Sequence, residues 1–288
     1  MTIKIATRSS KLALAQVNEF VKKFEISEFE IVKIKTEGDE KSAKGEFLFD
    51  KAYFVSDIQK ILLKGEADIA VHSAKDTPAE ERDNLTRYFI PSKSQKDILI
   101  FREKTEFNKK MKLGTSSLRR QLQAKHHLNA ENIFNLSGNV DTRLEKLSKG
   151  EYDCIILAKA GLERLDLLDE INYEEMGWST ASGQGYLGIE ISGDESTDVN
   201  KFLSASLKKH HETFGKTISI EREILKSINA GCNSAISMQT RINISSELIY
   251  SGEIYGKEEY ISYSGASVEE TIKDIKKHNG LKLLNEHN

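Results

Sequence analysis

The chain has 288 residues, of which 38% are hydrophobic and 30% are charged, and a formal net charge of −3. This balance is typical of a globular protein with two or three hydrophobic cores, and it gives no sign of a nucleic-acid binder or a polybasic membrane anchor. No apolar run is long enough to span a bilayer, residues 1–8 lack the pattern of a secretion signal, and two cysteines do not make a disulfide framework. We therefore expect a cytoplasmic protein.

The amino-terminal residues predict a strand followed by a helix. Residues 3–6 fit a strand, and residues 11–20 carry apolar side chains at helical spacing, with Ser9 or Ser10 as the N-cap. The start of a helix offers free backbone N–H groups and the positive end of the helix dipole, which suits an anion. Arg8 adds a positive charge at the same place.

A strand over 30–36 comes next, followed by a polar segment that continues to about Phe47. We interpret this segment, 39–48, as a mobile loop that could act as a lid. A helix over 55–63 then leads to an apolar run at 68–71, which predicts a buried strand.

Polar residues follow this buried strand at once: His72, Ser73, Lys75 and Asp76 precede Pro78, which cannot extend the strand. Open α/β sheets bind ligands at the carboxyl ends of their strands. One interpretation is a solvated loop. The other is a site where a carboxylate faces a cationic reaction centre and an ammonium holds an anionic substrate. On an extended backbone, the neighbours Lys75 and Asp76 would point to opposite sides.

The second part of the chain repeats two of these sequence patterns. After a strand over 97–101, residues 114–117 open a helix as residues 6–10 do, and residues 149–156 echo 64–71, each with a Lys-Gly-Glu-x-Asp turn before an apolar strand. We predict two related α/β domains that face each other across a cleft.

Arginines gather in the second of these domains. Arg119 and Arg120 lie in the first turn of a helix, while Arg143 and Arg164 follow glycine-containing turns. A single arginine of this kind would be a surface side chain or part of a salt bridge. Several beside Gly- or Ser-rich turns indicate binding of multiple carboxylates or phosphates, because guanidinium binds them bidentately.

A glycine-marked strand over 183–191 predicts a return to the first domain. From about Lys209 the pattern changes to a helix that ends near Ile228, three alternating strands at 238–244, 248–255 and 260–264, and a helix over 268–277. These elements predict a small α+β domain with an antiparallel sheet. The expected boundaries are 1–92 and 184–207 for a discontinuous first domain, 93–183 for the second and 208–288 for the third.

The two cysteines differ in their surroundings. Cys154 lies in an apolar strand and is expected to be inert. Cys232 follows Gly231 in a turn past a helix end, which fits either a half-buried loop cysteine or a nucleophile that carries a covalent group. No metal site is predicted, because the histidines lack a convincing set of ligand partners.

Taken in order, the motifs at 6–14, 70–78, 114–121, 138–144, 155–165, 183–185, 211–213 and 231–232 resemble the hydroxymethylbilane synthase family, also called porphobilinogen deaminases. The resemblance implies two domains like type II periplasmic binding proteins around a cleft, and a third that carries the cysteine. It also implies an activity: four porphobilinogens condense with loss of ammonia, and water releases hydroxymethylbilane for tetrapyrrole and haem biosynthesis. The expected protein is a monomer whose partner is this small substrate, with no nucleic acid or membrane.

The resemblance assigns roles to individual residues. Cys232 would hold a dipyrromethane cofactor through a thioether. Asp76 would be catalytic, because a carboxylate stabilises the azafulvenium cation that forms when ammonia leaves. The residues implied to bind substrate or cofactor are Arg8, Ser10, Lys51, Ser73, Lys75, Thr115, Ser116, Ser117, Arg119, Arg120, Gly138, Asn139, Arg143, Arg164 and Gln184.

Three positions depart from the family pattern. Ser137 stands where the family usually has an arginine, Asp141 adds negative charge where a small or neutral residue is usual, and Lys51 lacks its usual glycine-rich surroundings. Two alternatives therefore stay open: a divergent paralogue that binds pyrroles or another small anion without full turnover, and a plain two-lobed protein that binds a small anion.

Overall fold

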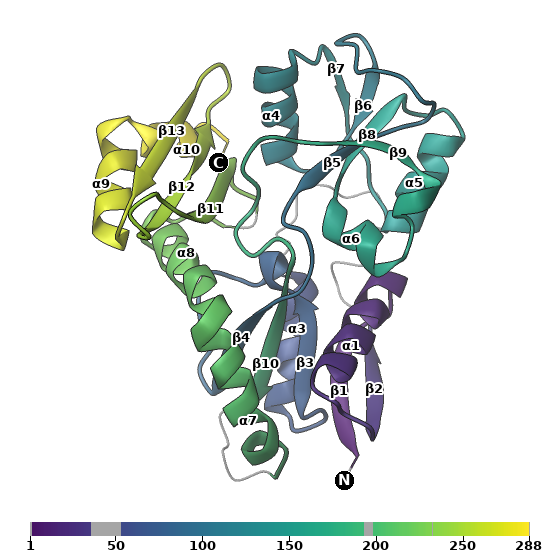
Figure 1. Ribbon diagram of the computed structural model, residues 1–288, viewed down its shortest axis with the longest axis vertical. Coiled ribbons are helices and arrows are strands. Elements are labelled where there is room, and N and C mark those ends of the chain that lie inside the picture. The colour runs from purple at the N-terminus through teal and green to yellow at the C-terminus, as the bar shows by residue number, and fades with distance from the viewer. Residues whose placement is uncertain (1, 36–52, 193–197, 232, 288) are drawn as a thin grey trace.

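The computed structural model describes residues 2–35, 53–192, 198–231 and 233–287, which form three domains (Figure 1). The predicted loop over 39–48, Lys51 and Cys232 lie outside the described residues. The first two domains are each built on a five-stranded sheet, and the third on a three-stranded sheet. The domain boundaries predicted from the sequence stay a prediction.

The first sheet has the strand order β2-β1-β3-β10-β4. Its strands are β1 (Ile3–Arg8), β2 (Phe29–Ile34), β3 (Ile69–Ser73), β4 (Leu85–Pro91) and β10 (Tyr186–Ser192). Strand β1 runs parallel to β2 and β3, whereas β10 is antiparallel to both of its neighbours, β3 and β4.

Alternation along the strands decides which helix covers which face of the first sheet. Ile5 and Val71 belong to a core with side chains of α1 (Lys11–Lys23) and α7 (Asp198–His210). Ala6 and Ala70 point the other way, toward α3 (Tyr53–Leu63). Both faces are therefore buried, as expected for a largely parallel sheet.

The second sheet repeats this order with β7-β6-β8-β5-β9. Its strands are β5 (Asp97–Phe101), β6 (Lys112–Gly114), β7 (Asn132–Phe134), β8 (Cys154–Ala158) and β9 (Asn172–Glu175). Strand β6 is parallel to β7 and β8, and β5 is antiparallel to β8 and β9. The helices are α4 (Leu118–Leu128), α5 (Val140–Ser148) and α6 (Lys159–Arg164), with a short 3₁₀ turn, η2 (Leu168–Glu170).

The repeated Lys-Gly-Glu-x-Asp turns make equivalent hydrogen bonds to a neighbouring strand in both domains. The carboxylate of Asp68 accepts a hydrogen bond from the backbone N–H of Lys4 at 2.8 Å, and that of Asp153 accepts one from Lys112 at 2.9 Å. Each turn thus joins the start of one parallel strand to the start of its neighbour. Gly65 and Gly150 adopt φ values of +70° and +76°, a backbone conformation that favours glycine. The predicted repeat is confirmed.

The chain crosses from the first domain to the second between β4 and β5, and returns between β9 and β10. After β10, helix α7, a π-helical turn over His211–Gly215 and helix α8 (Lys216–Ser227) run in succession from the first domain to the third (Figure 1). None of the helices formed by the described residues is long and apolar enough to cross a membrane.

The third domain is an antiparallel sheet of β11 (Ile236–Ile242), β12 (Leu248–Tyr255) and β13 (Tyr260–Gly265), covered by α8, α9 (Val268–Lys277) and α10 (Gly280–Asn285). The predicted strands and the helix over 268–277 are confirmed, whereas α10 was not predicted. Leu118 and Leu122 of α4 pack against Ala235 and Tyr255, which joins this domain to the second.

Candidate active site

A cleft lined with charged side chains lies where the three domains meet. Its largest cavity, about 470 Å³, is lined by Lys75 and Asp76 of the first domain, Arg119 and Arg120 of the second, and Arg222 of the third. A second hollow of about 210 Å³ lies between the first two domains, and a small one of about 50 Å³ lies against the first. Asp76 lines all three hollows.

Asp76 lies in a 3₁₀ turn, η1 (Ala74–Asp76), directly after β3. The backbone turns here instead of staying extended, so the alternation of side chains expected for an extended segment does not apply to Lys75 and Asp76. Both residues line the two larger hollows. The ammonium of Lys75 donates to Gln184 Oε1 at 3.4 Å.

A buried polar network lies behind this turn. His72 Nε2 is 3.2 Å from Glu190 Oε2, and His72 Nδ1 is 3.3 Å from the hydroxyl of Thr77. Arg87 and Gln59 also donate to the Glu190 carboxylate, at 2.9 Å each. Burial alone would raise the pKa of Glu190, but the contact with His72 and the charge of Arg87 outweigh it and lower this pKa to about 2. His72, which the sequence left in an exposed loop or a site, is therefore a buried support for η1.

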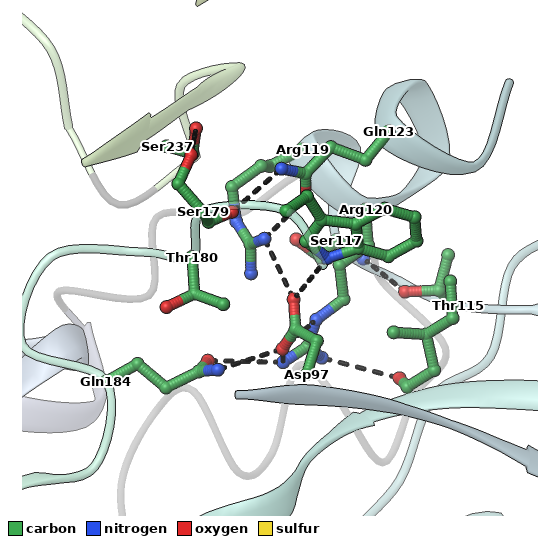
Figure 2. Close-up of polar contacts among 12 residues, drawn as sticks. Asp97, Thr115, Ser117, Arg119, Arg120, Gln123, Ser179, Thr180, Gln184 and Ser237 are labelled. Atoms are coloured by element: carbon green, nitrogen blue, oxygen red, sulfur yellow. Dashed lines mark hydrogen bonds and ion pairs between the residues drawn. The ribbon is translucent and has the colours of Figure 1, made fainter. Parts of the chain in front are cut away.

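Arg119 and Arg120 share a partner within the protein, Asp97 at the start of β5 (Figure 2). Arg119 Nη1 lies 2.9 Å from Asp97 Oδ2, and Arg120 Nη2 lies 2.7 Å from Asp97 Oδ1. Burial alone would raise the pKa of Asp97, but the two guanidinium charges and the hydrogen bonds from Arg120 and Gln184 hold it well below its usual range. Both arginines are thus oriented by a protein carboxylate, and a role for them in ligand binding stays a prediction.

Gln184 links these cations at the return crossing. Its Nε2 donates to Asp97 Oδ1 and to the carbonyl of Gln95, both at 2.9 Å. Its Oε1 accepts from Arg120 at 3.3 Å and from Lys75 at 3.4 Å. One amide therefore joins a cation of the first domain to a cation of the second.

Arg143 is half-buried and lines the hollow between the first two domains. Its Nε donates to the carbonyl of Gly138 at 2.7 Å, and its Nη2 donates to the hydroxyl of Ser116 at 3.3 Å. Burial and the charge of Arg120 lower the pKa of Arg143 to about 10, while the charge of Asp76 acts in the opposite direction. Arg8, Arg143 and Asp76 thus line the same 210 Å³ hollow and influence one another through their charges.

The helix starts line this hollow too. Ser10 caps α1, because its hydroxyl accepts from the N–H of Ala13 at 3.2 Å. Thr115 supports the start of α4 by accepting from the N–H of Ser117 at 3.3 Å. Ser73 accepts from Gln16 Nε2 at 2.8 Å. Of the predicted binding residues, those that line the 210 Å³ hollow are Arg8, Ser10, Ser73, Lys75, Ser116, Ser117, Arg120, Gly138, Asn139, Arg143, Arg164 and Gln184.

Comparison with known sequences decides the family. The family model described as porphobilinogen deaminase, dipyromethane cofactor binding domain, matches residues 3–200. The chain belongs to the porphobilinogen deaminase family.

Curated relatives agree along most of the chain. A probable porphobilinogen deaminase of Ignicoccus hospitalis is 38% identical over 82% of this chain and 80% of its own length. A porphobilinogen deaminase of Prochlorococcus marinus is 36% identical over 96% of this chain and 87% of its own length. Among solved structures, the probable amino-acid transporter binding protein ytmK of Bacillus subtilis matches 78% of this chain and 97% of that one, with a TM-score of 0.41 and 13% identity.

Two of the three departures from the family pattern, Ser137 and Asp141, have local explanations. Asp141 Oδ2 lies 3.7 Å from Lys11 Nζ, so its added negative charge faces a cation across the cleft. Lys146 Nζ lies 3.4 Å from the carbonyl oxygen of Ser137, which brings a positive charge to the position where the family usually has arginine. These contacts weaken the argument for a divergent paralogue.

Arg164 contacts the first domain in this structure. Its Nε lies 2.9 Å from Glu19 Oε2, and its Nη2 donates to Ser92 Oγ at 2.6 Å. Since Arg164 belongs to α6 and Glu19 to α1, this ion pair bridges the first two domains. Arg164 also lines the 210 Å³ hollow, but its guanidinium already has a carboxylate partner.

The sequence did not reveal Asp97, Glu190 or Arg222 as residues of the site. Each is a charged residue inside an apolar or amphipathic segment, and no local signal distinguishes such a residue from one at the surface. For Asp97 the sequence contained one local signal of burial, because this residue opens a strand that is otherwise entirely apolar. A buried charge there requires cationic partners.

Proposed function

We propose that the protein is a hydroxymethylbilane synthase that condenses four porphobilinogens. One observation carries this proposal: Gly231, Asn233 and Ser234, the neighbours of position 232, line the same 470 Å³ cavity as Asp76. A group attached at position 232 would therefore enter the cavity that contains the proposed catalytic carboxylate. The family model supports dipyrromethane as that group.

The cavity has the donors that a dipyrromethane requires. Each pyrrole of this group carries an acetate and a propionate, and carboxylates pair with guanidinium and ammonium groups through charge-assisted hydrogen bonds. Lys75, Arg119 and Arg120 line the cavity, together with the hydroxyls of Ser116 and Ser117. When bound, dipyrromethane would supply the pyrrole carbon on which the product grows.

Asp76 is proposed to act on the incoming substrate. Each condensation breaks the aminomethyl C–N bond of porphobilinogen, releases ammonia and leaves a cation. The methylene carbon of this cation bonds to a carbon of the terminal pyrrole of the growing chain, and that carbon then loses its proton. A carboxylate held beside this cation lowers the energy of its formation. We propose that Asp76 also accepts or returns a proton in this step.

The remaining cations are proposed to hold the carboxylates of substrate and product. Arg8 and Arg143 line the 210 Å³ hollow that continues from Asp76 between the first two domains. Two connected hollows, both lined by cations, suit a polyanion that lengthens in steps. We also propose that the protein is cytoplasmic and works as a monomer. Light scattering would test the oligomeric state.

The experiment combines intact mass with turnover. We expect the purified protein to exceed its sequence mass by a dipyrromethane, and Cys232→Ser to abolish this increase. Asp76→Ala should retain the added mass but lose turnover of porphobilinogen by at least about 10²-fold, the scale on which an electrostatic group acts. Asp169→Ala, at an exposed position in η2, is the matched control.

The divergent-paralogue alternative predicts a different result. An added mass without steady release of linear tetrapyrrole would support it. An unmodified mass after incubation with porphobilinogen would contradict the synthase and would also favour a paralogue that binds without turnover.

A further inference from the structure

Arg222 of α8 reaches from the third domain into the turn that carries Asp76. Its side chain is buried, with the residue only 6% exposed. Its Nη1 donates to the carbonyl oxygen of Thr77 at 2.6 Å, and its Nη2 donates to that of Ala74 at 2.5 Å. Nη2 also lies 3.4 Å from the carbonyl oxygen of Ser182, in the return crossing between domains.

The accepting carbonyls bracket Asp76. Ala74 lies two residues before it and Thr77 one residue after it, so one guanidinium holds both ends of η1. At the turn, the N–H of Thr77 donates to the carbonyl of Ala74 at 3.1 Å, and the hydroxyl of Thr77 lies 3.3 Å from His72 Nδ1 and 3.5 Å from the carbonyl oxygen of Ser73. A single 3₁₀ turn has poorer hydrogen-bond geometry than an α-helix, so outside partners help to hold it, and charge-assisted bonds are the strongest of these.

Helix α8 also leads to position 232. The helix ends at Ser227, and residues 228–231 follow directly to that position. The same helix therefore supports both the turn of Asp76 and the segment that precedes Cys232. A shift of α8 would move the two together.

We propose that Arg222 is a positioning residue that fixes the carboxylate of Asp76 in the cavity and ties its position to the third domain. This inference rests on the proposed function. Arg222 belongs to a different domain from Asp76, so the active geometry exists only when the third domain is docked on the first. A lysine cannot replace it, because a single ammonium lacks the planar fork that reaches two carbonyls at once.

Steady-state kinetics test this role. We expect Arg222→Lys and Arg222→Ala to lower kcat for porphobilinogen by about 10²-fold, the scale expected for a misplacement of about 1 Å, with KM changed less than threefold. Both variants should keep the mass added at Cys232. Methylguanidinium should restore part of kcat in Arg222→Ala and none in Arg222→Lys, since only the alanine variant leaves space for it. Arg241→Ala, an exposed arginine of the third domain, is the matched control.

Hydrogen exchange gives a readout that does not depend on activity. Amides of residues 72–77 should exchange faster in Arg222→Lys, while those of α3 in the same domain stay unchanged. Unchanged exchange at 72–77, or a kcat within threefold of the wild-type value, would overturn the proposal. A wild-type protein without turnover would instead refute the proposed function, and the exchange experiment would still decide the role of Arg222.

Discussion

At the scale of single residues, the site is notable for arginines that already have partners inside the protein. Asp97 orients Arg119 and Arg120, Glu19 orients Arg164, and backbone carbonyls orient Arg222. A guanidinium held in this way does not lose side-chain freedom when a ligand arrives, so the entropic cost of binding is smaller. The cleft is thus arranged before any carboxylate enters it.

Glu190 should make the stability of the protein depend on pH. Its folded pKa of about 2 lies below its ordinary value of 4.5, so its stabilising contribution is complete above about pH 5 and is lost as the pH falls from 4.5 toward 2. The shift corresponds to about 3 kcal/mol for this fully buried carboxylate. We expect Glu190→Gln to lower the free energy of unfolding at pH 7, and the difference from wild type to shrink as the pH falls.

Urea unfolding at a series of pH values measures this difference. Glu174→Gln, which changes an exposed glutamate of β9, is the matched control. A difference between wild type and Glu190→Gln that stayed constant from pH 7 to pH 3 would show that the Glu190 network does not titrate as described.

At the scale of elements, the two glycine turns offer a matched comparison within one chain. Gly65 and Gly150 occupy equivalent turns with similar positive φ, but a Cβ at position 65 would meet open space, whereas at position 150 it would lie 2.6 Å from Arg102 Nη1. Alanine in this backbone region costs about 1 kcal/mol. We expect Gly65→Ala to show roughly this loss of stability, and Gly150→Ala the same loss plus a small cost for moving a flexible side chain.

Thermal unfolding of the two variants would check this expectation. The difference between them isolates the contact with Arg102, because the backbone cost is shared. A neutral or stabilising effect of either substitution would contradict the left-handed conformation of that turn.

Local patterns predicted most elements, and long-range partners explain what they missed. The helix over 268–277 and the strand over 97–101 have the predicted bounds, because apolar periodicity and flanking turns are local signals. The turn at Lys75 and Asp76 was not predicted, because η1 is held by His72 and by Arg222, which is about 150 residues away in the chain. No local pattern contains that information. The cationic lining of the cleft was predictable because glycine and arginine recur together, but the internal partners of those arginines were not.

At the scale of the whole molecule, two ion pairs between described residues bridge the first and second domains. Arg164 and Glu19 form a short pair at 2.9 Å with Arg164 only 4% exposed, whereas Lys11 and Asp141 lie 3.7 Å apart and are largely exposed. Buried charge-assisted bonds contribute more than surface pairs, which are worth about 0–1 kcal/mol. We expect Glu19→Gln to cost roughly 1–3 kcal/mol and Lys11→Gln less than about 0.5 kcal/mol.

Hydrogen exchange would locate the effect of these substitutions. Glu19→Gln should increase exchange in residues 92–96, next to Ser92, which bonds both Arg164 and Glu19. Lys11→Gln should leave this crossing unchanged. Equal effects of the two substitutions would mean that burial of the bridge does not matter for the spacing of the domains.

The place of β10 between β3 and β4 has a consequence for synthesis on the ribosome. Every strand of the second sheet, β5 to β9, is made before β10, which the first sheet needs at its interior. At a synthesis rate of about 5–20 residues per second, β10 is made roughly 5–20 s after β3 and β4, between which it pairs. The second domain should therefore become protease-resistant on the nascent chain before the first, although it begins later in the sequence. During that interval the edges of β3 and β4 that pair with β10 are unpaired. Chaperones that shield unpaired strands would therefore act on this part of the nascent chain.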